Sequence, residues 1–182
     1  MGNNKTIRPC WIFPLITLTL LIVSSCSSQK KEATNPEKTM AIACPEDGKC
    51  TTQVFHNKSL EVKTDEFGGV YYQMQDHPET SVVLYQYARN VEKGLQDAQY
   101  REEIIFEIRH SDVTIIYNDS DLQKTKMLFG RFCFCRGQTG YYKVSHGNLD
   151  AVQKNDSIYF NLAFSVTEVP QVITSVTASA KK

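Results

Sequence analysis

The 182-residue chain carries 20 basic and 20 acidic residues, so its formal net charge is zero. Proteins that bind nucleic acid usually present a stripe of basic residues to the phosphate backbone, so this balance argues against such a partner.

The first 25 residues have the layout of an export signal. Lys5 and Arg8 form a short positive segment, and residues 11–23 form an apolar stretch. The stretch is shorter than the roughly 18 residues that span a bilayer, and it matches the roughly 7–15 residues of a signal-peptide core. Pro14 within it also argues against a permanent membrane-spanning helix. Removal of residues 1–25 would leave 18 basic and 20 acidic residues, a formal charge of −2.

Small residues precede a cysteine at the end of the apolar stretch, in the order Val23-Ser24-Ser25-Cys26. This arrangement resembles the lipobox of bacterial lipoproteins, with Val23 at a position that is usually Leu. The resemblance implies cleavage before Cys26, attachment of lipid to Cys26, and a location in the bacterial cell envelope. More than one acyl chain would then hold the protein on a membrane. The alternatives are a signal peptide without lipid, and an anchor helix followed by a cysteine that has no role.

Three further segments follow the predicted signal peptide. Residues 26–40 are polar beyond Cys26 and show no apolar periodicity, which is typical of a lipidated N-terminus with a flexible tether. Residues 41–176 have a normal length for one domain with its own core. Residues 177–182 are polar, and we expect a disordered tail there.

The predicted domain is rich in strand patterns. Residues 157–166 alternate apolar and polar side chains, and residues 102–109 do the same, as in half-buried strands. Residues 81–88 and 113–117 are short β-branched and aromatic runs. Residues 118–127 alone suggest a helix, and it is short. The sequence predicts an all-β fold, an antiparallel β-sandwich with a barrel as the alternative, with at most one short helix.

Four cysteines belong to the predicted domain: Cys44, Cys50, Cys133 and Cys135. Export places them in an oxidising compartment, where paired cysteines are first interpreted as disulfides. Their spacings differ from those of common zinc sites, so we expect neither a metal nor a cofactor.

Geometry ranks the three ways in which four cysteines can pair. If residues 128–137 form one strand, Cys133 and Cys135 point to the same face with Cα atoms about 6.6 Å apart, near the upper limit for a disulfide. The same periodicity places Leu128, Phe132 and Phe134 on the core side. Bridges from the 44–50 segment to Cys133 and Cys135 are therefore favoured. A local Cys44–Cys50 bond, with a strained or free Cys133/Cys135 pair, stays open because Pro45 and Gly48 suit a tight turn.

The sequence contains no G-x-S-x-G nucleophile elbow, no Walker phosphate-binding loop and no zincin helix, and we predict no enzymatic activity. The leading hypothesis is a non-catalytic module that binds protein or glycan, or has a structural role, at the membrane. Tyr141 and Tyr142, which follow the 136–140 loop, are the candidate binding surface. The alternative is a thiol-redox or metal-handling protein that uses Cys133 and Cys135.

Overall fold

The computed structural model describes residues 44–182 except residues 93 and 96. The predicted signal peptide, the lipidation site Cys26 and the tether at 26–40 lie outside the described residues. Within the described part, no helix is long and apolar enough to cross a membrane.

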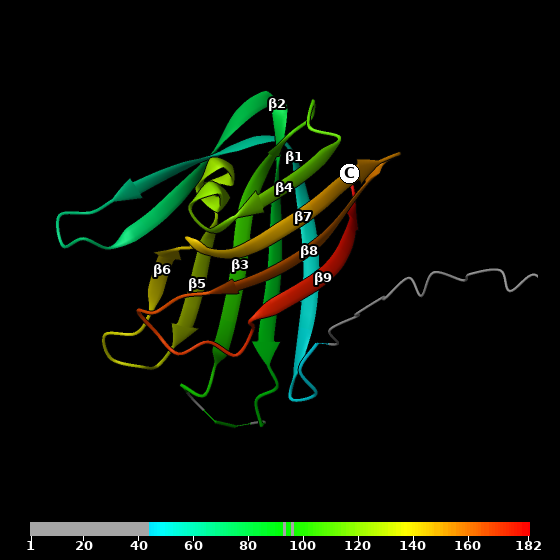
Figure 1. Cartoon of the computed structure of the whole chain (residues 1–182). Helices are drawn as coiled ribbons and strands as arrows, with labels where there is room; N and C mark the ends of the chain where they lie inside the picture. Colours follow the sequence, from blue (N-terminus) through cyan, green and yellow to red (C-terminus); the bar gives the residue numbers. More distant parts are fainter. Residues whose placement is uncertain (1–43, 93, 96) are drawn as a thin grey trace, which may run out of the picture. The chain divides into compact units, whose positions relative to one another are not determined.

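The described residues form nine strands and one 3-10 helix (Figure 1). In chain order these are β1 (Gly48–Thr64), β2 (Val70–Arg89), β3 (Tyr100–Arg109), β4 (Thr114–Asn118), η1 (Asp119–Thr125), β5 (Leu128–Cys133), β6 (Gly140–Lys143), β7 (His146–Lys154), β8 (Ser157–Ser165) and β9 (Ser175–Lys181).

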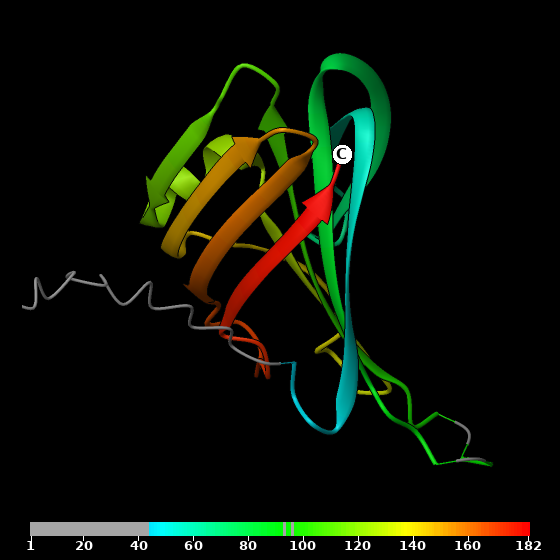
Figure 2. The same ribbon diagram turned by 90° about the vertical axis from the view of Figure 1, so that its right-hand side faces the viewer.

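The strands form two antiparallel sheets, which confirms the predicted fold class. The larger sheet has the order β1-β2-β3-β5-β6, and the smaller has the order β4-β7-β8-β9. Figure 2 shows the two sheets facing each other. Most strands that follow one another in the chain are also neighbours in a sheet, as antiparallel pairing allows.

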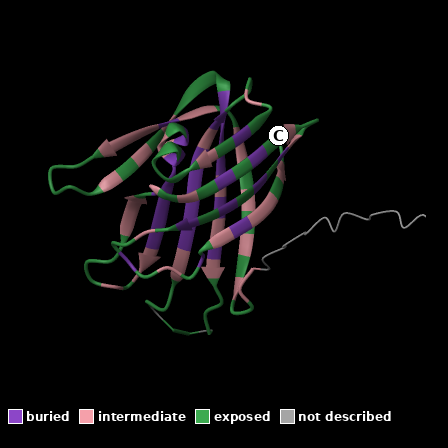
Figure 3. Ribbon diagram, in the orientation of Figure 1, coloured by how far each residue is buried: buried purple, intermediate pink, exposed green. Residues whose placement is uncertain are grey.

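The main core lies between the sheets (Figure 3). Alternate residues of β8, including Phe160 and Phe164, point inward and are almost completely buried. Phe160 packs edge-to-face on Phe106 of β3 with the ring centroids 5.3 Å apart, and Phe164 packs against Phe129 of β5 at 5.8 Å. The period-two pattern of β3 and β8 therefore produces the contact that joins the sheets.

A second, smaller core forms because the larger sheet closes on itself. Val70, at the start of β2, pairs with Tyr141 of β6, so β2, β3, β5 and β6 form a closed ring. Leu60, Ile105 and Leu128 are buried on this side. Neighbouring strand residues point to opposite faces, so Ile105 belongs to this core while its neighbours on either side belong to the first.

The ring closes because the long β1–β2 hairpin bends. The pairing register shifts between His56 and Lys58, and Asn57 adopts a positive φ of 52°. Beyond this bulge the hairpin crosses the outer face of the sheet and extends to the left in Figure 1. Glu107 of β3 accepts a hydrogen bond from the Leu60 N–H at 2.8 Å, and Lys126 donates to the Leu60 carbonyl at 2.8 Å. These two side chains fix the hairpin over the sheet.

The segments predicted to be a short helix and a disordered tail both have regular structure. The predicted short helix is the 3-10 helix η1, which buries Leu122 and is followed by Lys126 in the left-handed region. The predicted disordered tail is wrong, because residues 175–181 form β9 and pair with β8 along its length. Val176 is buried and Ala178 packs against the main core, so small apolar residues hold this strand in place.

Candidate functional site

Both disulfides of the described domain are local. Cys44 bonds to Cys50 with the Cα atoms 5.7 Å apart, and Cys133 bonds to Cys135 with the Cα atoms 5.1 Å apart. The favoured bridges between the 44–50 and 133–135 segments are therefore wrong. Cys50 lies on β1 and Cys133 on β5, and two strands separate them in the sheet. At about 4.8 Å per strand the separation is about 14 Å, well beyond disulfide reach.

The Cys133–Cys135 bond is possible because the strand ends early. β5 stops at Cys133, and the chain then turns, with the Gln138 N–H donating to the Cys135 carbonyl at 3.1 Å. Gly137 supplies a positive φ of 70° for this turn. An extended strand would hold the two Cα atoms about 6.6 Å apart, and leaving the extended conformation brings them within bonding distance.

The same early end exposes Phe134, which the strand pattern had placed in the core. Its side chain is 83% exposed. Phe132, the preceding residue of that pattern, is partly buried, packs edge-to-face on Tyr141 at 5.2 Å, and lies beneath the Arg101 guanidinium. Gly137, in the "RGQTG" segment, was the signal that the strand stops before residue 134.

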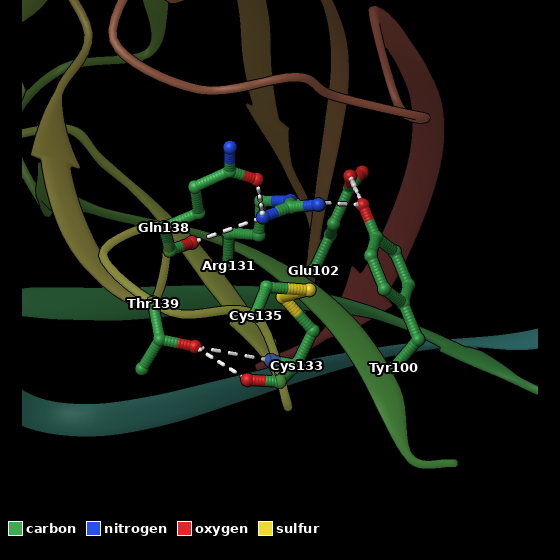
Figure 4. The surroundings of a disulfide bond; sticks show 7 residues. All are labelled: Tyr100, Glu102, Arg131, Cys133, Cys135, Gln138 and Thr139. Carbon is green, nitrogen blue, oxygen red and sulfur yellow. Dashed lines mark hydrogen bonds between the residues drawn. A yellow bond between two sulfur atoms is a disulfide. The ribbon is translucent and has the colours of Figure 1, made fainter.

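Polar contacts hold the loop that joins β5 to β6, residues 134–139 (Figure 4). The Thr139 hydroxyl accepts from the Cys133 N–H at 3.2 Å and donates to the Cys133 carbonyl at 2.8 Å. Arg131, which is 7% exposed, donates to the backbone carbonyl and the side-chain oxygen of Gln138 at 3.1 and 3.0 Å. The loop is therefore fixed at both of its ends by bonds that do not involve sulfur.

A buried glutamate links this loop to two other segments. The Tyr100 hydroxyl accepts from Arg131 at 3.3 Å and donates to Glu102, as Figure 4 shows. Glu102 is 1% exposed, and its two oxygens also accept from the Val172 and Ile173 N–H groups, both at 2.7 Å. Burial and the hydrogen bond to Glu102 raise the pKa of Tyr100 above its usual value. This network ties together β3, β5 and the segment around residue 172.

Open space borders the disulfide. A hollow of about 610 Å³ is lined by Cys133, Phe134, Cys135, Arg136, Gly137 and Thr139. A second hollow of about 340 Å³ shares Cys133 and Phe134 and continues along Arg101 and Asp97. Phe134 therefore stands between two hollows, with a cation at the edge of each.

The disulfide contributes little to stability. In the chain-entropy model, a bond that closes three residues stabilises the fold by about 1.6 kcal/mol, and one that closes seven residues by about 2.4 kcal/mol. A bridge across some 90 residues would give about 4–5 kcal/mol in the same model. The Cys133–Cys135 bond thus shapes a loop and contributes little to the stability of the domain.

Tyr141 and Tyr142 take opposite faces of β6. Tyr141 points into the closed ring, where it packs on Tyr72 with the ring centroids 5.1 Å apart and donates to Glu103 at 2.7 Å. Tyr142 packs against the main core. Edges of both tyrosines line a hollow of about 480 Å³ beside the β1–β2 turn, so a binding role for them stays a prediction.

Burial changes the titration of Tyr141. Burial and the hydrogen bond to Glu103 raise the pKa of the Tyr141 hydroxyl far above its ordinary value. Glu103 is 6% exposed and also pairs with the Arg101 Nε at 2.9 Å. Gly130 leaves room for this arrangement, since a Cβ there would lie 2.6 Å from the Tyr141 ring. Tyr141 therefore acts mainly as part of the packed ring.

The described residues offer neither a serine nucleophile nor a metal centre elsewhere in the domain. Ser81 lies 2.9 Å from the His110 Nε2, but its side chain is fully buried and out of reach of a substrate. In the described ranges, no cluster of three His, Cys, Asp or Glu side chains could hold a metal ion.

Comparison with known proteins adds no family to this description. No protein-family model matches the sequence, and neither the curated proteins nor the solved structures contain a match.

Proposed function

We propose that this chain is a lipid-anchored protein of the bacterial envelope that binds a protein partner through the loop at residues 133–139. The observation that carries the proposal is Phe134, an 83% exposed aromatic side chain held between two bonded cysteines. The lipobox-like segment at Cys26 supports the anchor, and the absence of a recognised catalytic motif supports a binding role.

An exposed phenylalanine in a fixed loop suits recognition. Burying a phenylalanine side chain fully contributes about 1.5–3 kcal/mol, and aromatic anchors dominate many interfaces. Binding also costs conformational entropy, and this cost falls when the anchor is already held in place. Here the disulfide and the Thr139 and Arg131 contacts limit the motion of the loop before any partner arrives.

Other exposed apolar side chains lie at the same end of the domain. Val91 and Leu95 come from the β2–β3 connection, and Val172 comes from the segment whose backbone bonds to Glu102. Tyr100, at the end of that connection, pairs with Cys133. Several segments therefore carry exposed apolar groups at the end of the domain that carries Phe134, which favours a protein over a glycan as the partner.

Site-specific photo-crosslinking in cells tests the partner. A photoreactive residue at Gln138, three residues beyond Cys135, should give a defined protein adduct, and Phe134→Ser should reduce its yield at least about tenfold. Phe67→Ser is the matched control, because Phe67 is 89% exposed in the β1–β2 turn and does not line either hollow beside the disulfide. Equal yields in the two variants would contradict the role of Phe134, and an adduct to glycan alone would contradict a protein partner.

The anchor has a separate test. Mass spectrometry of the N-terminal peptide should find acyl chains on Cys26, and Cys26→Ala should move the protein from the membrane fraction to the soluble fraction. An unmodified Cys26 in a processed chain would refute the lipoprotein assignment and leave the Phe134 test unaffected.

A further inference from the structure

We infer that Cys133–Cys135 is an exchangeable disulfide that oxidises a pair of thiols on another protein. This inference goes beyond the binding proposal and does not depend on it, since it requires neither a lipid anchor nor a contact at Phe134. It rests on the access to the sulfurs, the charges around them and the way in which the loop is held.

Access is the first argument. Exchange requires an incoming thiolate to approach a sulfur along the S–S axis, and buried disulfides resist it. The Cys133–Cys135 pair lies at the end of β5 and lines a hollow of about 610 Å³. Cys133 and Phe134 also border a second hollow, so a polypeptide segment can approach.

The second argument is that the loop keeps its place without the bond. Thr139 holds the backbone of Cys133, and Arg131 holds Gln138 on the returning segment. None of these contacts involves a sulfur, so the two thiols formed on reduction stay near each other. The pair can therefore close again, as a reversible dithiol must.

The third argument is local charge. Arg136 follows Cys135 directly and lines the same hollow, whereas Arg101 of the neighbouring hollow is already paired with Glu103. A nearby cation favours a thiolate, and a stabilised thiolate is a better leaving group in exchange.

The other disulfide serves as a comparison within the same molecule. Cys44 and Cys50 flank a turn in which the Gly48 N–H donates to the Pro45 carbonyl at 3.0 Å, and both pack against the main core. Their bond closes seven residues and supports the start of β1. We therefore expect Cys44–Cys50 to react slowly and Cys133–Cys135 to react quickly.

The exchange balances without an external oxidant. One thiolate of the partner attacks one sulfur of the pair, forming a mixed disulfide as the Cys133–Cys135 bond breaks and the other sulfur leaves as a thiolate. The second thiolate of the partner then attacks the mixed disulfide and releases the second sulfur. Two partner thiols become one disulfide, Cys133 and Cys135 become two thiols, and the two protons pass from the partner thiols to these cysteines.

Timed alkylation of the purified full-length chain tests the inference. The probe is a reduced synthetic peptide with two cysteines, and peptide mass spectrometry follows both protein disulfides in the same sample. We expect Cys133–Cys135 to open at least about tenfold faster than Cys44–Cys50, with one peptide disulfide formed for each pair opened. Arg136→Gln should slow the opening, and its circular dichroism should match that of the original chain.

Each outcome is decisive. Equal rates for the two disulfides, or faster opening of Cys44–Cys50, would overturn the inference. So would loss of the β-sheet signal on selective reduction of Cys133–Cys135, because the bond would then be a structural staple. The purified chain and the peptide probe are sufficient, so failure of the partner proposed above would leave this result unchanged.

Discussion

Tyr141→Phe tests the buried polar contact inside the closed ring. The substitution removes the hydroxyl that donates to Glu103 at 2.7 Å and keeps the ring packed on Tyr72 and Phe132. A hydrogen bond to a buried charged group contributes about 1.5–3 kcal/mol. Glu103 keeps its ion pair with Arg101, so we expect Tyr141→Phe to lower the free energy of unfolding by about 1.5–3 kcal/mol at pH 7.

The same variant should change the response to alkali. Burial raises the pKa of Tyr141, so the hydroxyl stays protonated in the native state at a pH where it ionises in the unfolded chain. The stability that this provides is present below about pH 10, the usual tyrosine pKa, and is lost as the pH rises above it. One such group changes the free energy of unfolding by at most about 1.4 kcal/mol per pH unit, and Tyr141→Phe should remove that contribution.

Urea denaturation followed by circular dichroism, at pH 7 and at steps between pH 9 and 11, measures both effects. Tyr71→Phe is the control, because Tyr71 is exposed on β2, the strand that pairs with β6 at Tyr141, and should change stability by less than about 0.5 kcal/mol. If Tyr141→Phe unfolds like the control at pH 7 and keeps the alkaline slope of the original chain, the Glu103 contact does not stabilise the fold.

Three further substitutions probe other parts of the domain. Glu102→Ala should destabilise it by about 3–5 kcal/mol, because it leaves the Val172 and Ile173 N–H groups and the Tyr100 hydroxyl without an acceptor, and urea denaturation should detect this loss. Phe106→Ala should cost about 3–5 kcal/mol in the same assay, because it opens a cavity between the sheets, and a loss below 1 kcal/mol would contradict the packing described. Replacing Cys133 and Cys135 together by Ser should cost only about 1.6 kcal/mol, and unfolding of the purified double variant would show that the bond is a staple.

Local periodicity accounts for the part of the fold that the sequence predicts. The alternation in β8 and β3 identifies the inward face of each strand, and burial of Phe160 and Phe106 follows from it. β9 carries a weaker form of the same signal, since Val176 and Ala178 alternate with polar residues. Small side chains bury little apolar area, so this strand resembled a tail.

Long-range order accounts for what the sequence does not predict. The pairing of Val70 with Tyr141 depends on a bend at Asn57, and neither end of the contact carries a local signal for it. The prediction of the cysteine pairing was wrong for a similar reason, because the sequence does not show that β2 and β3 lie between Cys50 and Cys133. To predict that Phe134 is exposed, one must know that β5 ends at Cys133. The ends of strands depend on turn chemistry more than on the period of the strand.

The contacts to Leu60 have a consequence for molecules that meet side by side. The free flank of a strand can recruit a strand from another copy, which is a route to aggregation. At Leu60 the Glu107 and Lys126 side chains occupy the backbone N–H and carbonyl that such a strand would need, and the two charges also pair with each other at 2.9 Å. For chains concentrated in the plane of a membrane, as the proposed anchor implies, this blocked flank would help neighbouring copies stay separate.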